Sequence, residues 1–329
     1  MSKRVTIKSI AEDLGISHMT VSRALSGNPN VLKATRDTVI RRAQELGYVR
    51  SAAASAMRGD LSPIVGLLIP NITNDFYARF ANSLAESCEA HGLQLIIHLT
   101  KDDFDTERLA MTRLREVQAR AVVTVPAPLP DANAVPAEIA DHGIDMVQLI
   151  RRRDHDGVLG AVLVDDAGAL QDAVLHLHRQ GHGRIAYLGA PDTLSSGRER
   201  FAAYRAGLRA AGIAEDPALC LLEPPSLEMG DRLARHILDQ TDATAILCAG
   251  FEISNGALKA LIQRDALGAR LAFVGYGDPE FYSWIRGGLT TIRVPVDELA
   301  DCTVDMITGQ EPEARGRDHG FAATLLLRG

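Results

Sequence analysis

The sequence predicts an α/β protein that consists of a helical head, a hinge and a two-lobed body with parallel sheets. Three observations predict this fold class. Short amphipathic helical patterns occupy residues 1–50, small residues follow over 51–62, and apolar strands alternate with longer helices over 63–329. Such alternation is typical of parallel sheets that carry helices on both faces.

Length and charge agree with this division. The 329 residues exceed one domain of about 150 residues, and a composition of 46% hydrophobic and 23% charged residues is globular. Residues 1–60 hold ten Lys and Arg against five Asp and Glu, so the net charge of −7 leaves −12 on the remainder. A basic head on an acidic body predicts a polyanionic partner for the head alone.

The head contains three helical patterns. The first has apolar residues at helical spacing, namely Ile7, Ile10, Ala11 and Leu14, and ends at Gly15. Ser17 is a favourable N-cap for the second helix. The third is expected over residues 33–46, with a buried side formed by Val39, Ile40, Ala43 and Leu46.

The first two helices and their turn are typical of a helix-turn-helix. The second helix leaves Met19, Ser22 and Arg23 facing outward, with His18 at the flank. An arginine there can fork onto a guanine edge while neighbouring side chains contact other bases. Hydroxyl and amine groups that could bind phosphates complete the predicted DNA-binding set, which adds Thr6, Lys8, Ser17, Thr20 and Thr35. The alternative is an ordinary three-helix bundle with a solvated basic face.

The body contains strands and helices in alternation, which form two units of similar length. Strands are expected at 64–70, 93–99, 121–126, 161–164, 184–189, 245–249 and 271–274, and helices at 76–91, 105–118, 167–180, 196–211 and 253–264. Ligands of such sheets bind at the carboxyl ends of the strands, so the crevice between the two units is the expected site.

Catalysis and membrane insertion are not expected. Cys88, Cys220, Cys248 and Cys302 are too far apart for a zinc or redox motif, the ten histidines are scattered, and no phosphate-binding glycine motif follows a strand. We therefore expect no enzyme activity, no cofactor and no metal. The apolar runs are too short for a bilayer and no targeting segment begins the chain, which predicts a cytoplasmic protein.

Residues 5–27, VTIKSIAEDLGISHMTVSRALSG, resemble the head of the LacI/GalR family of bacterial repressors. Further resemblance follows in family order, with GLLIPNITN at 66–74, GHGRIA at 181–186 and LTTIR at 289–293. The stretch MTVSRAL is similar to the gluconate-repressor branch. The resemblance implies a dimeric or tetrameric regulator of transcription whose body is like that of periplasmic sugar-binding proteins, with an effector bound between the lobes.

The resemblance also implies effector-binding residues. Phe76 and Tyr77 match aromatic residues of the first effector loop, and Arg151 follows the fourth strand. Arg198 matches the arginine that grips the polar groups of the effector, and Asp278 matches the end of a Gly-Phe-Asp-Asp motif. Core packing is the alternative for the aromatic residues, and surface ion pairs are the alternative for the arginines.

The sequence departs from the family where many sugar-binding members have Asn-Asp, because it has Gly250 and Phe251 there. Gly277 likewise replaces an acid. These changes predict a pocket that has lost negative charge and kept Arg198. An unpaired buried guanidinium costs several kcal/mol, whereas a carboxylate pairs with it in bidentate fashion. We therefore expect a sugar-acid effector such as gluconate rather than a neutral sugar.

The hinge is expected to respond to DNA. A helix over residues 51–58 is too short to be stable alone, so we expect it to fold only on the operator. Two such helices would pair through faces that include Ala54, and Met57, where the family usually has leucine, would enter the minor groove as a wedge.

Residues 321–329 carry no leucine heptad for a tetramer bundle, which favours a homodimer on a near-palindromic operator. The predicted function is thus a sequence-specific repressor that a sugar or sugar acid controls. The alternative is a small-molecule binding protein with a vestigial head, and a DNA shift assay distinguishes the two.

Overall fold

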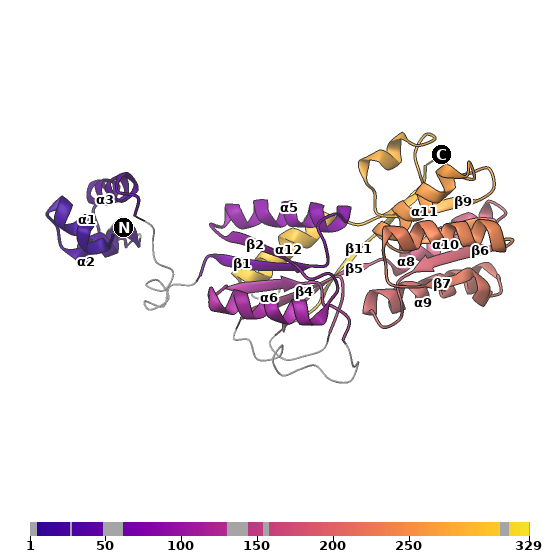
Figure 1. Cartoon of the computed structure of the whole chain (residues 1–329), viewed down its shortest axis with the longest axis horizontal. Helices are drawn as coiled ribbons and strands as arrows, with labels where there is room; N and C mark the ends of the chain where they lie inside the picture. Colours follow the sequence, from indigo (N-terminus) through magenta and orange to yellow (C-terminus); the bar gives the residue numbers. More distant parts are fainter. Residues whose placement is uncertain are drawn as a thin grey trace. The chain divides into compact units, whose positions relative to one another are not determined.

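The computed structural model describes residues 5–26, 28–48, 62–129, 144–153, 158–309 and 316–328. The chain divides into two compact units, residues 1–62 and 63–329. The second unit contains two lobes (Figure 1). In the part of the chain that the structure describes, no helix is long and apolar enough to cross a membrane.

The head is a bundle of α1 (Ile7–Leu14), α2 (His18–Leu25) and α3 (Lys33–Glu45). Its small core is built from fully buried Ile10 and Val21 with residues of α3. Gly15 has a φ of 65°, a left-handed conformation that glycine adopts without strain, and it turns the chain from α1 into α2.

The prediction was wrong for one residue of the head core. Ile40 was expected on the buried side of the third helix, but it is 38% exposed. Val39 and Ala43 face α1 and α2 instead. Ile40 follows Val39 directly and is therefore rotated by roughly 100° about the helix axis, which turns it away from the core.

The first lobe has a parallel sheet in the order β11-β5-β4-β3-β1-β2. Its strands are β1 (Ile64–Ile69), β2 (Gln94–Leu99), β3 (Ala121–Thr124), β4 (Asp145–Leu149), β5 (Val158–Asp165) and β11 (His319–Ala322). Side chains of β1 alternate between the two faces. Val65 and Leu67 pack toward α5 (Asp75–Ala90) and α12 (Val296–Thr308), and Leu68 packs toward α6 (Phe104–Glu116).

The second lobe has a sheet in the order β12-β10-β9-β8-β6-β7, in which β12 alone runs antiparallel to its neighbour. Its strands are β6 (Ile185–Gly189), β7 (Cys220–Leu222), β8 (Ala245–Cys248), β9 (Ala272–Tyr276), β10 (Thr291–Arg293) and β12 (Thr324–Leu326). One face carries α8 (Ala167–Arg179) and α9 (Ser195–Ala211), and the other carries α10 (Leu227–Gln240) and α11 (Phe251–Gln263). Two 3₁₀ helices are η1 (Pro217–Leu219) and η2 (Glu280–Trp284).

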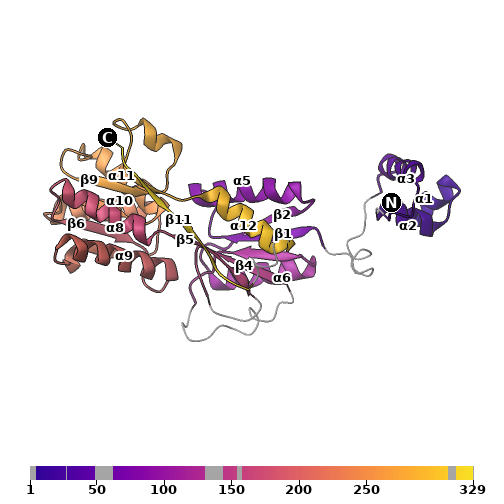
Figure 2. The same cartoon turned by 180° about the vertical axis from the view of Figure 1, so that it is seen from behind.

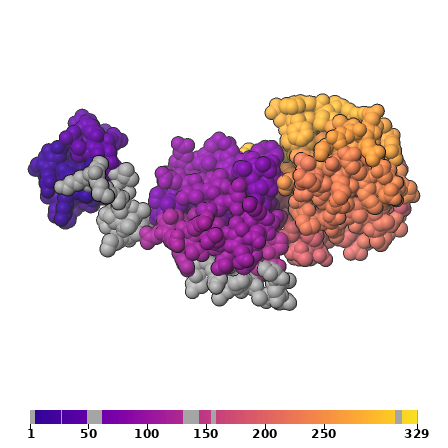
Figure 3. Space-filling model, viewed as in Figure 1, coloured from indigo at the N-terminus to yellow at the C-terminus, as the bar shows by residue number. Residues whose placement is uncertain are grey.

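The lobes are interwoven, which the sequence analysis did not foresee. Within the described residues the chain passes between them from β5 into α8, from β10 into α12 and from β11 into β12. The late segments α12 and β11 therefore belong to the first lobe (Figure 2). Figure 3 shows the lobes as two adjoining masses. The carboxyl ends of β1, β6 and β8 lead into loops at the boundary between the lobes, where a ligand site is expected.

Candidate nucleic-acid interface and ligand pocket

The N-terminus of α2 is fixed by its cap. The Ser17 hydroxyl accepts a hydrogen bond from the Thr20 backbone N–H at 3.0 Å and lies 2.9 Å from the Thr20 hydroxyl. On the opposite side, Val21 and Ala24 are buried against α1 and α3. The helix is therefore anchored at one end and along one side.

The free side of α2 presents three exposed side chains, His18, Met19 and Arg23. Met19 is 52% exposed, so its apolar side chain is available for contact. Thr20 and Ser22 are half-buried at the edges of this side. A helix that presents a guanidinium, an imidazole and an apolar tip together suits the edges of bases in a major groove.

The other predicted DNA contacts lie at two places in the head. Lys8 is exposed on α1, and Thr35 is half-buried in the first turn of α3. Thr6 caps α1 through a reciprocal pair of hydrogen bonds with Ser9, so its side chain already has a structural role. Ala54 and Met57 lie outside the described residues.

The body has a pocket between its lobes, lined by both of them. Three aromatic rings form one wall: the Phe251 ring lies 5.2 Å from that of Phe76 and 5.3 Å from that of Tyr276, between ring centroids. Tyr77 stands beside them, and its burial raises the pKa of the phenol to about 12. The space left among the lining side chains is about 60 Å³.

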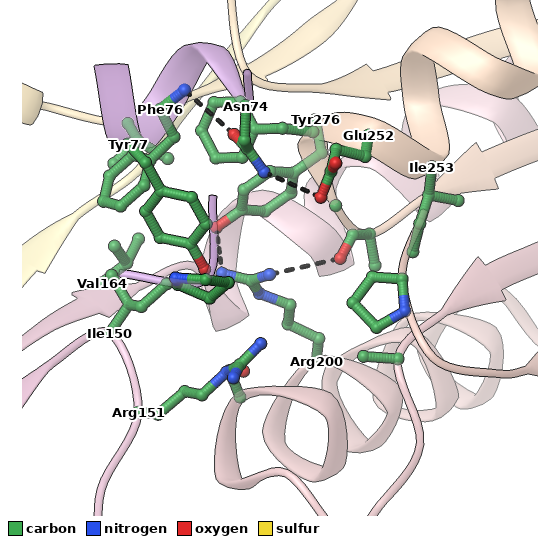
Figure 4. Close-up of a pocket in the computed structure, with 18 of the residues that line it drawn as sticks. Asn74, Phe76, Tyr77, Ile150, Arg151, Val164, Arg200, Glu252, Ile253 and Tyr276 are labelled. Carbon is green, nitrogen blue, oxygen red and sulfur yellow. Dashed lines mark hydrogen bonds between the residues drawn. The ribbon is translucent and has the colours of Figure 1, made fainter. Parts of the chain in front are cut away.

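A polar contact joins the two lobes across this pocket. Asn74, the N-cap of α5, donates a hydrogen bond from Nδ2 to the Glu252 carboxylate at 3.2 Å, and the same side chain accepts one from the Phe76 backbone (Figure 4). Burial raises the pKa of Glu252, while the hydrogen bond from Asn74 opposes that shift. The pocket therefore contains an acidic group that the sequence analysis did not name.

Arg200 is the arginine of the second lobe that reaches the pocket. Its Nε donates to Asp166 at 2.6 Å, and another nitrogen donates to the Ala249 carbonyl at 3.2 Å. A further nitrogen donates to the Tyr276 hydroxyl at 2.6 Å (Figure 4). The guanidinium also lies 4.2 Å from the centroid of the Tyr276 ring. The Tyr276 hydroxyl in turn donates to Asp166. These contacts hold the guanidinium in one orientation at the lobe boundary.

Arg151 supplies the positive charge of the first lobe and is also paired. It is 5% exposed, and its two terminal nitrogens donate to the two Asp102 oxygens at 2.5 and 3.3 Å. The backbone is strained beside both members of this ion pair. Ile150 has a φ of 52°, which a β-branched residue rarely adopts, and Lys101 and Asp102 have φ values of 58° and 55°.

Two predicted effector residues lie away from this pocket. Arg198 is exposed and donates to the Asp192 carbonyl at 3.0 Å. Asp278 accepts two hydrogen bonds from Arg328, at 2.5 and 3.0 Å. Phe76, Tyr77, Arg151 and Phe251, by contrast, all line the pocket.

The helical period explains why Arg200 and not Arg198 turns inward. Arg200 precedes the buried Ala203 and Tyr204 by three and four residues, so it shares their side of α9. Arg198 stands four residues before the exposed Ala202. This helical signal was present in the sequence, and it places Arg200 rather than the predicted Arg198 at the pocket.

The departures from the family pattern have a packing reason. Gly277 has a φ of +89°, and a Cβ there would lie 2.2 Å from the Phe251 ring. The ring therefore requires the glycine. The inference that the pocket has lost negative charge is nevertheless wrong, because Glu252, Asp102 and Asp166 surround its two arginines.

The described residues contain no group of three or more His, Cys, Asp or Glu side chains that could hold a metal ion. The acidic groups near the pocket are instead engaged with arginines or with Asn74. The pocket offers hydrogen bonding and ring contact to a ligand.

Two family models match the chain. One, described as bacterial regulatory proteins of the lacI family, covers residues 6–51, and the other, described as periplasmic binding proteins and sugar binding domain of LacI family, covers residues 62–275. The Sucrose operon repressor of Klebsiella pneumoniae is 28% identical over 338 residues, which cover 99% of each chain.

Solved structures are similar over nearly the whole chain. The lac repressor dimer bound to operator and the anti-inducer ONPF has a TM-score of 0.82 at 23% identity, over 99% of this chain and 98% of that one. The complex of the transcriptional regulator CelR with cellobiose has a TM-score of 0.70 at 25% identity, over 99% of each chain. The helix-turn-helix head and the two-lobed body are confirmed. The chain belongs to the LacI family of DNA-binding transcriptional regulators.

Proposed function

We propose that this regulator is a repressor that binds a near-palindromic operator as a homodimer and responds to a sugar held between its lobes. The observation that carries the proposal is the interlobe pocket, to which each lobe contributes an arginine, an acid and at least one aromatic ring. A ligand that contacts both sets of groups changes the relative stability of lobe arrangements, which is the requirement for control at a distance.

The head supports the DNA side of the proposal. His18, Met19 and Arg23 are exposed together on a helix whose other side is buried. Two such heads in a homodimer would read two half-sites related by a two-fold axis, so operator symmetry follows from the symmetry of the protein. The similar lac repressor structure is itself a dimer bound to operator.

The pocket favours a neutral, hydroxyl-rich ligand. Arg151 and Arg200 are already paired with Asp102 and Asp166, so neither leaves an uncompensated charge for an anion to neutralise. The acidic end of gluconate, the sugar acid predicted from the sequence, would find no unpaired guanidinium among these residues. Ring faces from Phe251 and Phe76 with a few fixed polar groups are typical of small-molecule sites.

The test begins with selection of genomic fragments that the full-length protein binds, followed by fluorescence anisotropy on the selected fragment. We expect tight binding to that fragment, weaker binding to scrambled DNA, and a shift in affinity when the correct sugar is added. Equal affinity for selected and scrambled DNA would instead support a small-molecule binding protein with a vestigial head. Sedimentation of the complex should show two chains per operator.

A further inference from the structure

A second hollow lies beside the interlobe pocket and shares Arg151 with it. Its volume is about 310 Å³, against about 60 Å³ for the interlobe pocket. Small-molecule sites usually offer roughly 300 Å³ or more, so the interlobe pocket alone is small for a sugar with a further substituent. The polar lining of the hollow consists of Arg151, Arg152, Arg153, Arg198, Thr193 and Ser195.

Four arginines line the hollow, and one of them forms no ion pair with a described carboxylate. Three of its arginines pair with carboxylates that are not part of its lining: Arg151 with Asp102, Arg152 with Asp318 and Arg153 with Glu107. Arg198 donates a hydrogen bond to the Asp192 carbonyl and forms no ion pair with a carboxylate in the described part of the chain, while its charge opposes the rise that burial causes in the pKa of the neighbouring Glu199. Among the described residues, no acid lines this hollow.

Buried contacts hold the arginine segment in place. Glu107 is 1% exposed and accepts from Arg153 at 2.8 Å, and Gln148 bonds to both the backbone N–H and the carbonyl of Arg153 at 2.8 and 2.6 Å. The Arg152 backbone N–H donates to the Ser195 hydroxyl at 2.9 Å, which links the segment to the start of α9. The cations are therefore positioned before any ligand arrives, which lowers the cost of binding.

Two further features favour an anion in this place. Arg151 is 5% exposed, and its Nε is buried without a hydrogen-bond partner. Helix α9 begins at Ser195 with Leu194 as its N-cap, so no side-chain oxygen satisfies the first amides of the helix. The positive end of the helix dipole adds to the charge of the arginines at the edge of the hollow.

We propose that this hollow is an anion subsite, which holds the phosphoryl or carboxylate group of an effector whose hydroxyl-bearing part occupies the interlobe pocket. The proposal rests on the sugar site proposed above and specifies its substrate class. Arg198 would supply the guanidinium that has no carboxylate partner, and the Thr193 hydroxyl would supply a further hydrogen bond.

The experiment measures binding of inorganic phosphate to the full-length protein by calorimetry at constant ionic strength. The test variant is Arg198→Gln, and the matched control is Arg209→Gln, which removes another exposed arginine of α9 outside the hollow. We expect wild type and control to bind phosphate equally and Arg198→Gln to bind at least about tenfold more weakly, since one charge-assisted hydrogen bond is lost. Circular dichroism confirms that the variants are folded.

Glucose, glucose 6-phosphate and gluconate then serve as separate probes. A greater loss of 6-phosphate binding than of gluconate binding in Arg198→Gln assigns a phosphoryl group, and the reverse assigns a carboxylate. Equal phosphate affinity in Arg198→Gln and Arg209→Gln would overturn the anion subsite. If a neutral sugar alters operator affinity while phosphate shows no Arg198-dependent binding, the proposed function stands and the anion subsite is wrong. If no sugar alters operator affinity but Arg198-dependent phosphate binding persists, the sugar-controlled function fails and the anion subsite stands.

Discussion

Replacing Arg200 by methionine tests how strongly the lobe boundary depends on one buried ion pair. The Arg200 and Asp166 side chains are 12% and 6% exposed, and their contact is 2.6 Å. Without the guanidinium, Asp166 keeps its hydrogen bond from the Tyr276 hydroxyl but loses its cation. Removal of one partner from a buried pair costs about 3–5 kcal/mol, and we expect the unfolding free energy of the body to fall by that amount.

Urea unfolding followed by circular dichroism measures this loss. Asp166→Asn in the same chain removes the uncompensated charge and should therefore restore part of the stability. Arg205→Met is the control, because the Arg205–Glu215 pair one turn later is exposed and contributes less than about 1 kcal/mol. A loss for Arg200→Met no larger than that of the control, or no recovery of stability when Asp166→Asn is added, would contradict this prediction.

Three further predictions concern the head, the pocket and the helix packing. Arg23→Ala should lower the binding free energy by about 1–3 kcal/mol on the operator and by less on random DNA. Lys8→Ala should weaken binding to both DNAs and lower the slope of log affinity against log salt concentration by about one. Equal losses of affinity for Arg23→Ala on both DNAs would show that Arg23 does not recognise a base. Glu252→Gln should raise the unfolding free energy at pH 8 and leave it unchanged below pH 4.5. Burial raises the pKa of Glu252 in the folded protein, so the wild-type fold loses stability as pH rises and this carboxyl ionises, whereas glutamine cannot ionise. A variant less stable than wild type at pH 8 would contradict this. Gly256→Ala should lower the unfolding free energy by roughly 1–3 kcal/mol, since its Cβ would lie 2.0 Å from the Leu227 carbonyl oxygen. Gly168→Ala is the control: its Cβ would meet nothing within 4 Å, and it should raise the unfolding free energy by up to about 1 kcal/mol. Similar thermal midpoints for the two variants would exclude the clash.

Local patterns predicted the helices of the head and much of the alternation in the body, because periodicity and capping act over a few residues, but helices α10 and α12 were not predicted. The helices of the head and the alternation of the body follow from residues such as Ile10, Val21 and Leu67, which are fully buried in the structure. The interweaving of the lobes had no such local signal. Segment α12 has an ordinary amphipathic sequence, and nothing within it indicates that Ser83 and Ser87 of α5 will donate to its Asp297 and Asp301.

The aromatic wall of the pocket was largely predictable, because the family resemblance pointed to Phe76 and Tyr77, and Phe251 stands where the sequence departs from the family pattern. The acidic residues were missed for a different reason. Glu252 directly follows Phe251, one position after the place where many family members have a carboxylate, so the family pattern did not indicate it. Its contact with Asn74 joins residues 178 positions apart in the chain, so only the packing of the lobes reveals it.

The net charge at each hollow depends on whether its arginines form ion pairs, and this charge determines which ligand the hollow favours. Arg151 finds Asp102 at 49 positions' separation because successive left-handed residues, Lys101 and Asp102, turn that carboxylate toward it. Arg200 finds Asp166 at 34 positions' separation, where the chain passes from one lobe to the other. Both pairs neutralise the two arginines of the interlobe pocket, whereas Arg198, in the adjoining hollow, forms no ion pair among the described residues. A sugar ring and an anionic group would then be recognised in two adjoining places by different residues, and a change at Arg198 should alter the preference for charged ligands without removing the contacts that hold the ring.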